Sequence, residues 1–391
     1  MSGVTSPLGF RAAGVVAGLK SSGNADMAVV INDGPQTSAA AVFTSNRCKA
    51  NPVLWSQEAM TSGSAKAVVI NSGGANCYTG PAGFEVTHAT AELAAEKLGG
   101  DADGVGAIDV QVMSTGLIGL LNDKDAVLAG TVAAIECAAV DGGTRAAEAI
   151  MTTDTVPKMA SEQSAGAEWT VGGMAKGAGM LAPALATMLV VLTTDAVADS
   201  ATLDAALRAA TAKTFDRLDS DGCQSTNDTV LLMASGASGI TPTSDELAEV
   251  VSRVCHSLAL QLLADAEGAD HEIAIDVVGA ATEADALEVG RAVARSNLFK
   301  CAIYGKDPNW GRILASVGTT GAVFDPADLD VTLNGVPVCV SSGPGAAPDE
   351  VSLESRAVSV VIDLKSGDEA ATIWTNDLTH AYVHENSAYS T

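Results

Sequence analysis

Basic residues and aromatic side chains are scarce in this 391-residue chain. Only 21 Lys and Arg stand against 47 Asp and Glu, which gives a formal net charge of −26, and aromatic residues make up 4% of the composition. A negative field of this size repels phosphate backbones and anionic membrane surfaces. We therefore expect neither nucleic acid nor a membrane as a partner.

Histidine-based motifs and paired cysteines are also lacking. None of the five histidines lies in H-E-x-x-H, and no serine lies in G-x-S-x-G, so neither a metalloprotease nor a His-based triad is supported. The seven cysteines are odd in number, widely spaced and never arranged as Cys-x-x-Cys, so we expect no disulfide framework and no metal site. The acidic turn Asp219–Gly222 lacks the other ligand positions of a calcium loop and is interpreted as solvated.

No long apolar run occurs near the N-terminus. The first 22 residues have no basic start, and Arg11 and Lys20 flank an apolar run of only eight residues. Such a run is too short for an export signal or for a membrane span. Together with the unpaired cysteines, this pattern predicts a cytoplasmic protein.

Apolar residues, by contrast, make up 47% of the chain, enough to bury a core in two or three structural units. Short β-like runs alternate with helical periods, which favours an α/β or α+β fold. Strands are predicted at 28–32, 67–71, 105–113, 188–193, 229–234, 272–278, 331–333 and 358–364. Helices are predicted at 85–98, 202–218 and 284–295 and, most clearly, from the capping box Thr243–Glu246 to Gly268. Linker-like composition occupies 161–179 and 341–349.

The segment 171–196 can carry chemistry, because a Gly-rich approach leads into a buried strand that opens with Thr187. Flexible backbone before a small hydroxyl residue would allow the chain to cut itself by an N-to-O acyl shift. The new α-amine, with an ordinary pKa of about 8, could then act as general base for the Thr hydroxyl. From the residues alone, an ordinary strand start at Thr187 and a solvated Lys176 are the favoured interpretation of this segment.

The same segment, KGAGMLAPALATML at 176–189, resembles the self-cleavage signature of the ornithine acetyltransferase (ArgJ) family. Further blocks similar to that family follow in the same order along essentially the whole chain. They are FTSNRCKANPV at 43–53, NSGGANCYTG at 71–80, STGLIG at 114–119, MTTDTVPK at 151–158, STNDTV at 225–230, ADAEGA at 264–269, YGKDPNWGR at 304–312 and HAYVHENSAYST at 380–391.

The resemblance implies a fold and a processing event. It predicts a sandwich of the DmpA/ArgJ type, with sheets flanked by helices. It also predicts cleavage between Ala186 and Thr187, which gives an alpha chain of residues 1–186 and a beta chain of residues 187–391. The chains would assemble as a heterotetramer of two alpha and two beta chains.

The resemblance also implies the roles of individual residues. Thr187 would be the nucleophile, and Thr115 and Gly116 would form the oxyanion hole, where each donor is typically worth about 2.7 to 4 kcal/mol. The substrate contacts would be Thr153, Lys176, Thr187, Glu267, Asn386 and Thr391. Lys176 could pair with a carboxylate of the substrate and Glu267 with an ammonium group.

The implied reaction moves an acetyl group from N2-acetylornithine to glutamate through an acetyl ester on Thr187. It needs no metal and no redox cofactor. Whether acetyl-CoA serves as a second acetyl donor stays open at this stage. Two alternatives also stay open, namely an aminopeptidase or amidase that uses the same self-exposed Thr with water as acceptor, and a binding protein without catalytic activity.

Overall fold

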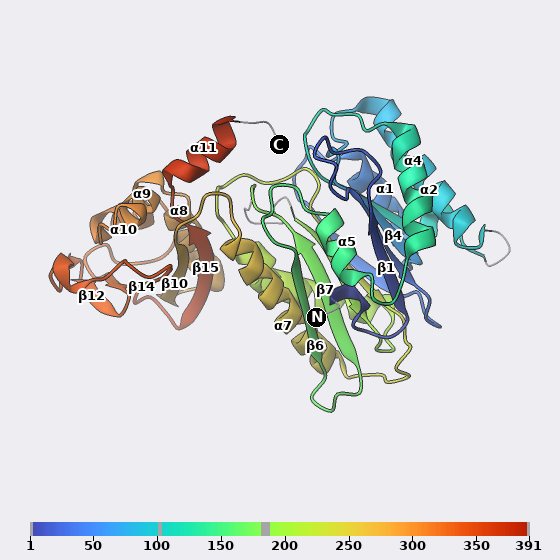
Figure 1. Cartoon of the computed structure of the whole chain (residues 1–391). Helices are drawn as coiled ribbons and strands as arrows, with labels where there is room; N and C mark the ends of the chain where they lie inside the picture. Colours follow the sequence, from blue (N-terminus) through green and yellow to red (C-terminus); the bar gives the residue numbers. More distant parts are fainter. Residues whose placement is uncertain (1–2, 101–103, 181–187, 389–391) are drawn as a thin grey trace.

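The computed structural model describes residues 3–100, 104–180 and 188–388. Within these residues the strands form three sheets (Figure 1). The first sheet has the order β1 (Phe10–Val15), β2 (Met27–Asn32), β4 (Ala67–Asn71) and β5 (Val110–Ser114). The second has the order β3 (Ala39–Phe43), β9 (Thr229–Ala234), β8 (Leu189–Thr194), β7 (Thr170–Lys176) and β6 (Lys158–Gln163). The third has the order β13 (Gly343–Pro344), β12 (Val336–Val340), β11 (Asp330–Leu333), β14 (Ala357–Asp363), β10 (Glu272–Ala280) and β15 (Glu369–Asn376).

The first two sheets pack face to face and are covered by helices on their outer faces. Their facing strands bury one apolar cluster, in which Val30 and Ile70 of the first sheet join Val191 and Leu231 of the second. The helices over the first sheet are α2 (Gly80–Lys97) and α4 (Lys124–Cys137), with α1 (Asn51–Ala59) and α5 (Gly143–Ala149) at its sides. The helices over the second sheet are α6 (Ser200–Lys213) and α7 (Ser244–Ala264). The predicted mixed α/β sandwich with flanking helices is therefore confirmed.

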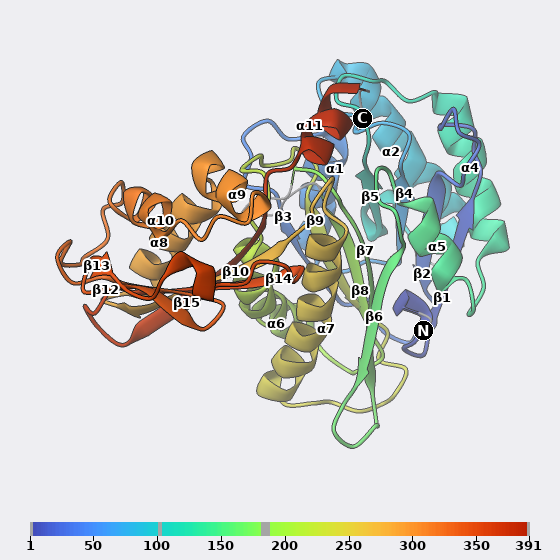
Figure 2. The same cartoon turned by 60° about the vertical axis from the view of Figure 1, so that its left-hand side comes forward.

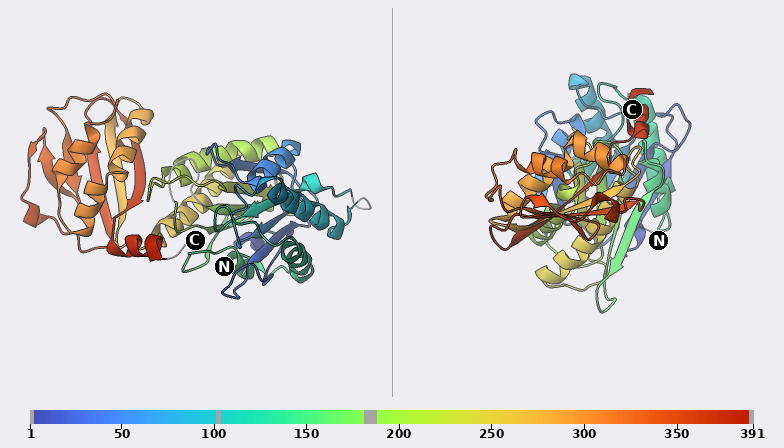
Figure 3. Two further views of the ribbon diagram at one scale, coloured as in Figure 1. Left: turned by 90° about the horizontal axis from the view of Figure 1, so that it is seen from above. Right: turned by 90° about the vertical axis from the view of Figure 1, so that its left-hand side faces the viewer.

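The third sheet forms a separate C-terminal unit with its own core, which stands beside the sandwich when viewed from above (Figure 3). Its apolar face is covered by three helices, and a further helix follows the last strand at the end of the chain. These helices are α8 (Glu283–Ala294), α9 (Asn297–Tyr304), α10 (Trp310–Val317) and α11 (His380–Ala388). Strands β10 and β14 pair in parallel inside this sheet, while their outer neighbours β15 and β11 pair with them antiparallel.

The predicted linker at 161–179 is wrong, because most of this segment is the hairpin of β6 and β7. Its glycines serve close packing. A Cβ atom at Gly172 would lie 2.1 Å from the carbonyl oxygen of Gly3, and one at Gly173 would lie 2.7 Å from Leu192. Glycine in a strand can mark such close approach as well as flexibility.

Helix α7 was predicted from its capping box and its apolar period, and both are confirmed. The Thr243 hydroxyl accepts the N–H of Glu246 at 3.3 Å, and the Glu246 carboxylate accepts the N–H of Thr243 at 2.9 Å. The helix is long and apolar enough to cross a membrane by composition alone. Figure 2 shows α7 beside β6 and β7, and its buried apolar side chains belong to the core cluster of this sheet, so it is a core helix.

The acidic turn at Asp219 differs from the prediction of a solvated turn. Its carboxylate is fully buried and accepts a hydrogen bond from Nε of Arg295 at 2.8 Å. Burial raises the pKa of Asp219 to about 6, although the Arg295 charge opposes that rise. The sequence pattern of acidic residues carries no information on this partner, which lies 76 residues further along the chain.

Candidate active site

A pocket of about 180 Å³ opens where the ends of the sandwich strands meet the C-terminal helix α11. Five of the predicted site residues line it, although they come from distant parts of the chain. They are Thr115, Gly116, Thr153, Glu267 and Asn386. Ala186, Thr187 and Thr391, which were predicted as cleavage site, nucleophile and substrate contact, lie outside the described residues.

The predicted oxyanion residues sit in a tight turn directly after β5. The N–H of Thr115 donates to the carbonyl oxygen of Asn71 at 3.0 Å, which fixes the start of the turn. Gly116 has φ +118°, and a Cβ there would lie 3.1 Å from the Gly73 carbonyl oxygen, so only glycine suits this position. The turn is therefore held with Gly116 at the pocket wall.

A pocket residue that sequence reasoning missed, Asn227, holds this turn from the other side. Its Nδ2 donates to the carbonyl oxygens of Ser114 at 2.8 Å and of Ala75 at 2.6 Å. Both carbonyls belong to segments that flank the predicted oxyanion residues. The only sequence indication for Asn227 was its position within the family-like block STNDTV.

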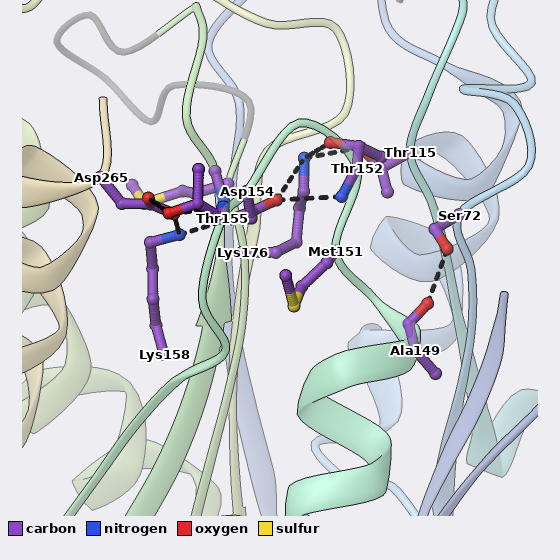
Figure 4. Close-up of polar contacts among 12 residues, drawn as sticks. Ser72, Thr115, Ala149, Met151, Thr152, Asp154, Thr155, Lys158, Lys176 and Asp265 are labelled. Carbon is purple, nitrogen blue, oxygen red and sulfur yellow. Dashed lines mark hydrogen bonds and ion pairs between the residues drawn. The ribbon is translucent and has the colours of Figure 1, made fainter. Parts of the chain in front are cut away.

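Lys176, predicted as a substrate contact, is buried beneath the pocket at the end of β7. Its Nζ donates to the Thr152 hydroxyl oxygen at 2.6 Å and to the Thr115 hydroxyl oxygen at 3.2 Å, as Figure 4 shows. Burial lowers the pKa of Lys176, and the nearby carboxylate of Asp154 is the strongest influence in the opposite direction. The ammonium group thus lies next to the predicted oxyanion hydroxyl.

A buried ion-pair network continues from Lys176 into the protein (Figure 4). Asp154 lies 3.9 Å from Lys176 Nζ, and its other oxygen lies 2.6 Å from Nζ of Lys158. Lys158 also lies 2.6 Å from a carboxylate oxygen of Asp265. Burial disfavours ionisation of Asp154, yet the charges of Lys176 and Lys158 lower its pKa to about 2. Sequence reasoning did not assign a role to any of the three residues Asp154, Lys158 and Asp265.

Glu267 and Asn386 meet at the opposite wall of the pocket. The Asn386 side-chain amide donates to a Glu267 carboxylate oxygen at 3.0 Å. The backbone N–H of Glu267 donates to the carbonyl oxygen of Ala178 at 2.9 Å, which joins the end of α7 to the segment after β7. A Cβ at Gly179 would lie 2.7 Å from both Glu267 carboxylate oxygens, so the two segments touch.

Met188, the second residue after the predicted cleavage bond, is also fixed in place. The backbone N–H of Met188 donates to a carboxylate oxygen of Asp228 at 3.0 Å, and both residues are buried. Burial raises the pKa of Asp228 well above its usual range, while the hydrogen bond from Met188 opposes that rise. Strands β8 and β9, which begin directly after these residues, pair in parallel from Leu189 with Thr229 onward.

Comparison with known proteins finds a match along nearly the whole chain. The ArgJ family matches residues 11–391. The chain belongs to the ArgJ family. Proteins named arginine biosynthesis bifunctional protein ArgJ from Streptomyces avermitilis and Thermobifida fusca are 59% and 60% identical to it over 387 and 388 residues, covering 99% of this chain and 99% and 100% of theirs.

Solved structures include a crystal structure of ornithine acetyltransferase complexed with ornithine from Mycobacterium tuberculosis. It is 53% identical and covers 48% of this chain and 96% of that chain, with a TM-score of 0.44. The predicted family resemblance is thus confirmed by the family match and by full-length relatives. ArgJ-family membership covers every residue that lines the pocket, from Ala75 to Asn386 in α11.

Proposed function

We propose that this ArgJ-family protein is an ornithine acetyltransferase, a glutamate N-acetyltransferase of arginine biosynthesis. It would move an acetyl group from N2-acetylornithine to glutamate through an acetyl ester on Thr187. The observation that carries the proposal is the pocket, which unites Thr115, Gly116 and Glu267 although they are far apart in sequence. The names of the full-length relatives support the same pathway.

Self-cleavage would prepare the nucleophile. The Thr187 hydroxyl oxygen attacks the carbonyl carbon of Ala186, the C–N bond breaks, and the proton of the hydroxyl passes to the leaving nitrogen. Water then hydrolyses the resulting ester, which leaves a carboxylate on Ala186 and a free α-amine on Thr187. The hydrogen bond from Met188 to Asp228 supports this step, since it anchors the residue that follows Thr187 in the chain.

Acetyl transfer would then proceed in two half-reactions. The Thr187 amine accepts the proton of its own hydroxyl, and the oxygen attacks the acetyl carbonyl of N2-acetylornithine. The oxygen of the tetrahedral intermediate takes the negative charge and accepts hydrogen bonds from the Thr115 hydroxyl and the Gly116 N–H. Collapse of the intermediate returns the proton to the departing amine of ornithine. The amine of glutamate attacks the acetyl ester by the same steps in reverse.

Substrate recognition would use the polar wall of the pocket. The Glu267 carboxylate suits the ammonium group of an ornithine side chain, and Asn386 holds that carboxylate in place. Thr153 lines the same cavity and offers a neutral hydrogen-bonding hydroxyl. For Lys176 the two hydroxyl partners support a place beside the oxyanion turn, and its contact with a substrate carboxylate remains part of the proposal.

The remaining expectations belong to this proposal. The chemistry runs through a hydroxyl, an amine and backbone donors, so no metal or redox cofactor is required. Acetyl-CoA would act as a second acetyl donor, in keeping with the bifunctional name of the relatives. The processed alpha and beta chains would assemble as a heterotetramer in the cytoplasm.

The proposal is tested with purified protein by N-terminal sequencing, intact mass and product analysis. We expect two chains, the second starting at Thr187, with an added acetyl group after incubation with N2-acetylornithine alone. Addition of glutamate should release N-acetylglutamate, and Thr187→Ala should stay uncut and inactive. Release of free acetate in place of N-acetylglutamate would favour the hydrolase alternative, and an active uncut wild-type chain would refute the mechanism.

A further inference from the structure

Lys158 occupies an unusual position for a lysine, because it has no solvent exposure and two carboxylate partners. Lysine is almost never fully buried unless it is paired. Both partners, Asp154 and Asp265, lie in segments that lead directly to the pocket. The pocket residues Thr153 and Glu267 are within two residues of them in sequence.

Each carboxylate of this network also binds backbone that shapes the site. Asp154 accepts the N–H of Gly177 at 2.7 Å and that of Thr152 at 3.0 Å. Asp265 accepts the N–H of Thr155 at 2.9 Å. The ion pairs therefore tie together the loop 151–157, the segment after β7 and the end of α7.

The charges in the network balance. Lys158 and Lys176 supply two positive charges, and Asp154 and Asp265 supply two negative charges, which gives a net charge of zero inside the protein. Lys176 stands at the end next to the pocket, where its Nζ meets the Thr115 hydroxyl oxygen at 3.2 Å. The opposite end of the network, at Asp265, is also almost fully buried.

The protonation of Lys176 decides which way the Thr115 hydroxyl can point. An ammonium group has three donors and no acceptor, so the Thr115 oxygen must accept from it, and the hydroxyl hydrogen remains available to the pocket. A neutral amine has a lone pair and can accept that hydrogen. Deprotonation of Lys176 would thus allow the hydrogen bond to reverse and would withdraw a donor from the oxyanion hole.

We propose that Asp154, Lys158 and Asp265 are positioning residues that together set the protonation of Lys176, with Asp154 favouring its ammonium form and the Lys158 charge opposing it, and that they thereby aim the Thr115 hydroxyl into the pocket. The proposal rests on the proposed function, because it takes Thr115 as an oxyanion donor. None of the three residues needs to touch substrate. Their contribution is electrostatic, and it acts through Lys176.

Two single substitutions at neighbouring positions should shift the alkaline limit of activity in opposite directions. Asp154→Asn removes the strongest electrostatic support for the Lys176 ammonium and lowers the pKa of Lys176. Lys158→Met removes a positive charge that disfavours the ammonium and raises that pKa. Activity that needs protonated Lys176 is lost as pH rises through its pKa. The pH at which kcat falls on the alkaline side should therefore be lower in Asp154→Asn and higher in Lys158→Met than in the wild type.

Other charged groups that act on Lys176 stay in place in both variants. Glu267 and Asp228 favour its ammonium form from the end of α7 and the start of β9. Lys20 lies close enough for the Lys176 charge to lower the pKa of Lys20, and its Nζ donates to the Met151 carbonyl oxygen at 2.7 Å. Because these groups are common to all variants, the difference between Asp154→Asn and Lys158→Met reports on the network itself.

The experiment combines the pH dependence of acetyl transfer with nitrogen NMR of the lysine side chains. Protein labelled with 15N-lysine gives the titration of Lys176 Nζ directly, and the signal is assigned with Lys176→Arg. The double variant Lys158→Met/Asp265→Asn keeps the network neutral, which guards against a folding defect in Lys158→Met. Lys365→Met is the matched control, because Lys365 also bridges two aspartates, Asp328 and Asp330 at 2.7 and 2.9 Å, but in the C-terminal unit.

We expect Asp154→Asn to lower kcat about 100-fold at alkaline pH, a loss typical of a misdirected catalytic group. Lys158→Met or its double variant should retain activity to higher pH than the wild type, and Lys365→Met should match the wild type. Parallel loss in Asp154→Asn and Lys158→Met with an unmoved alkaline limb would overturn the proposal and assign the network a structural role. If the wild type transfers no acetyl group, the proposed function fails, whereas opposite shifts of the Lys176 nitrogen titration would still establish the network.

Discussion

Replacing Gly179 by alanine should displace Glu267 without altering the chemistry of acetyl transfer. A Cβ at this position would lie 2.7 Å from both carboxylate oxygens of Glu267, closer than real Cβ contacts allow. The colliding atoms are the far end of a side chain, and Gly179 does not have a positive φ, so the carboxylate can move while the backbone stays. Its hydrogen bond from Asn386, 3.0 Å long, would then break.

The expected magnitude follows from the interaction that is lost. A hydrogen bond to a charged group contributes about 1.5 to 3 kcal/mol, which corresponds to a rise in KM for N2-acetylornithine of about 10-fold to 150-fold. The atoms nearest to the added methyl group all belong to Glu267, not to the oxyanion turn at Gly116 or to Lys176, so kcat should change much less. Initial rates over a range of N2-acetylornithine concentrations measure both constants.

The matched control is Gly311→Ala, because Gly311 is an exposed position in α10 where a Cβ meets only the Asn309 side chain at an ordinary 3.5 Å. Gly179→Ala must first be shown to cut itself normally, since Gly179 precedes the predicted cleavage bond by seven residues. An unchanged KM in a correctly cut Gly179→Ala protein would refute the placement of Glu267 in the substrate site.

Two further changes test single contacts. Asp228→Ala should slow self-cleavage, because it removes the acceptor of the Met188 N–H. Asp228→Asn retains an acceptor oxygen and should slow it less. A time course of chain separation on denaturing gels compares the two variants. Asp219→Asn should flatten the pH dependence of stability between pH 4 and 6. With a folded pKa of about 6, above the ordinary 3.8, Asp219 binds its proton more tightly in the folded state, so its contribution of about 3 kcal/mol is present at low pH and is lost as pH rises. Urea unfolding midpoints across this pH range measure the effect, and parallel curves for Asp219→Asn and the wild type would contradict it.

The sequence predicted those features that depend on local patterns. The capping box at Thr243 defines the start of α7 to the residue, while the helix ends at Ala264, four residues before the predicted end at Gly268. The strand that opens the predicted beta chain was placed at 188–193 and is observed as β8 at Leu189–Thr194. The collinear motifs also led to Thr115, Gly116 and Glu267, which the fold brings to one pocket.

Features that depend on distant partners could not be predicted in this way. Lys158 and Asp265 are 107 residues apart, and nothing in either local sequence indicates that they pair. A lysine in a strand is ordinarily exposed, so its burial contradicts the usual expectation for its residue type. The β6–β7 hairpin was missed for a related reason, because its glycines make room for Gly3 and Leu192, which lie outside the hairpin.

Cleavage before Thr187 should leave the two chains associated, because the cut would fall beside a sheet that both chains share. Strand β8 of the beta chain pairs with β7 of the alpha chain over six residue pairs, from Val171 with Thr194 to Lys176 with Leu189. The buried Lys158–Asp265 ion pair also crosses between the chains, and breaking such a pair leaves charges without partners inside the protein. We therefore expect both chains to elute together in gel filtration and to separate only in denaturant. Elution of a free beta chain under native conditions would show that the shared sheet does not hold the processed protein together.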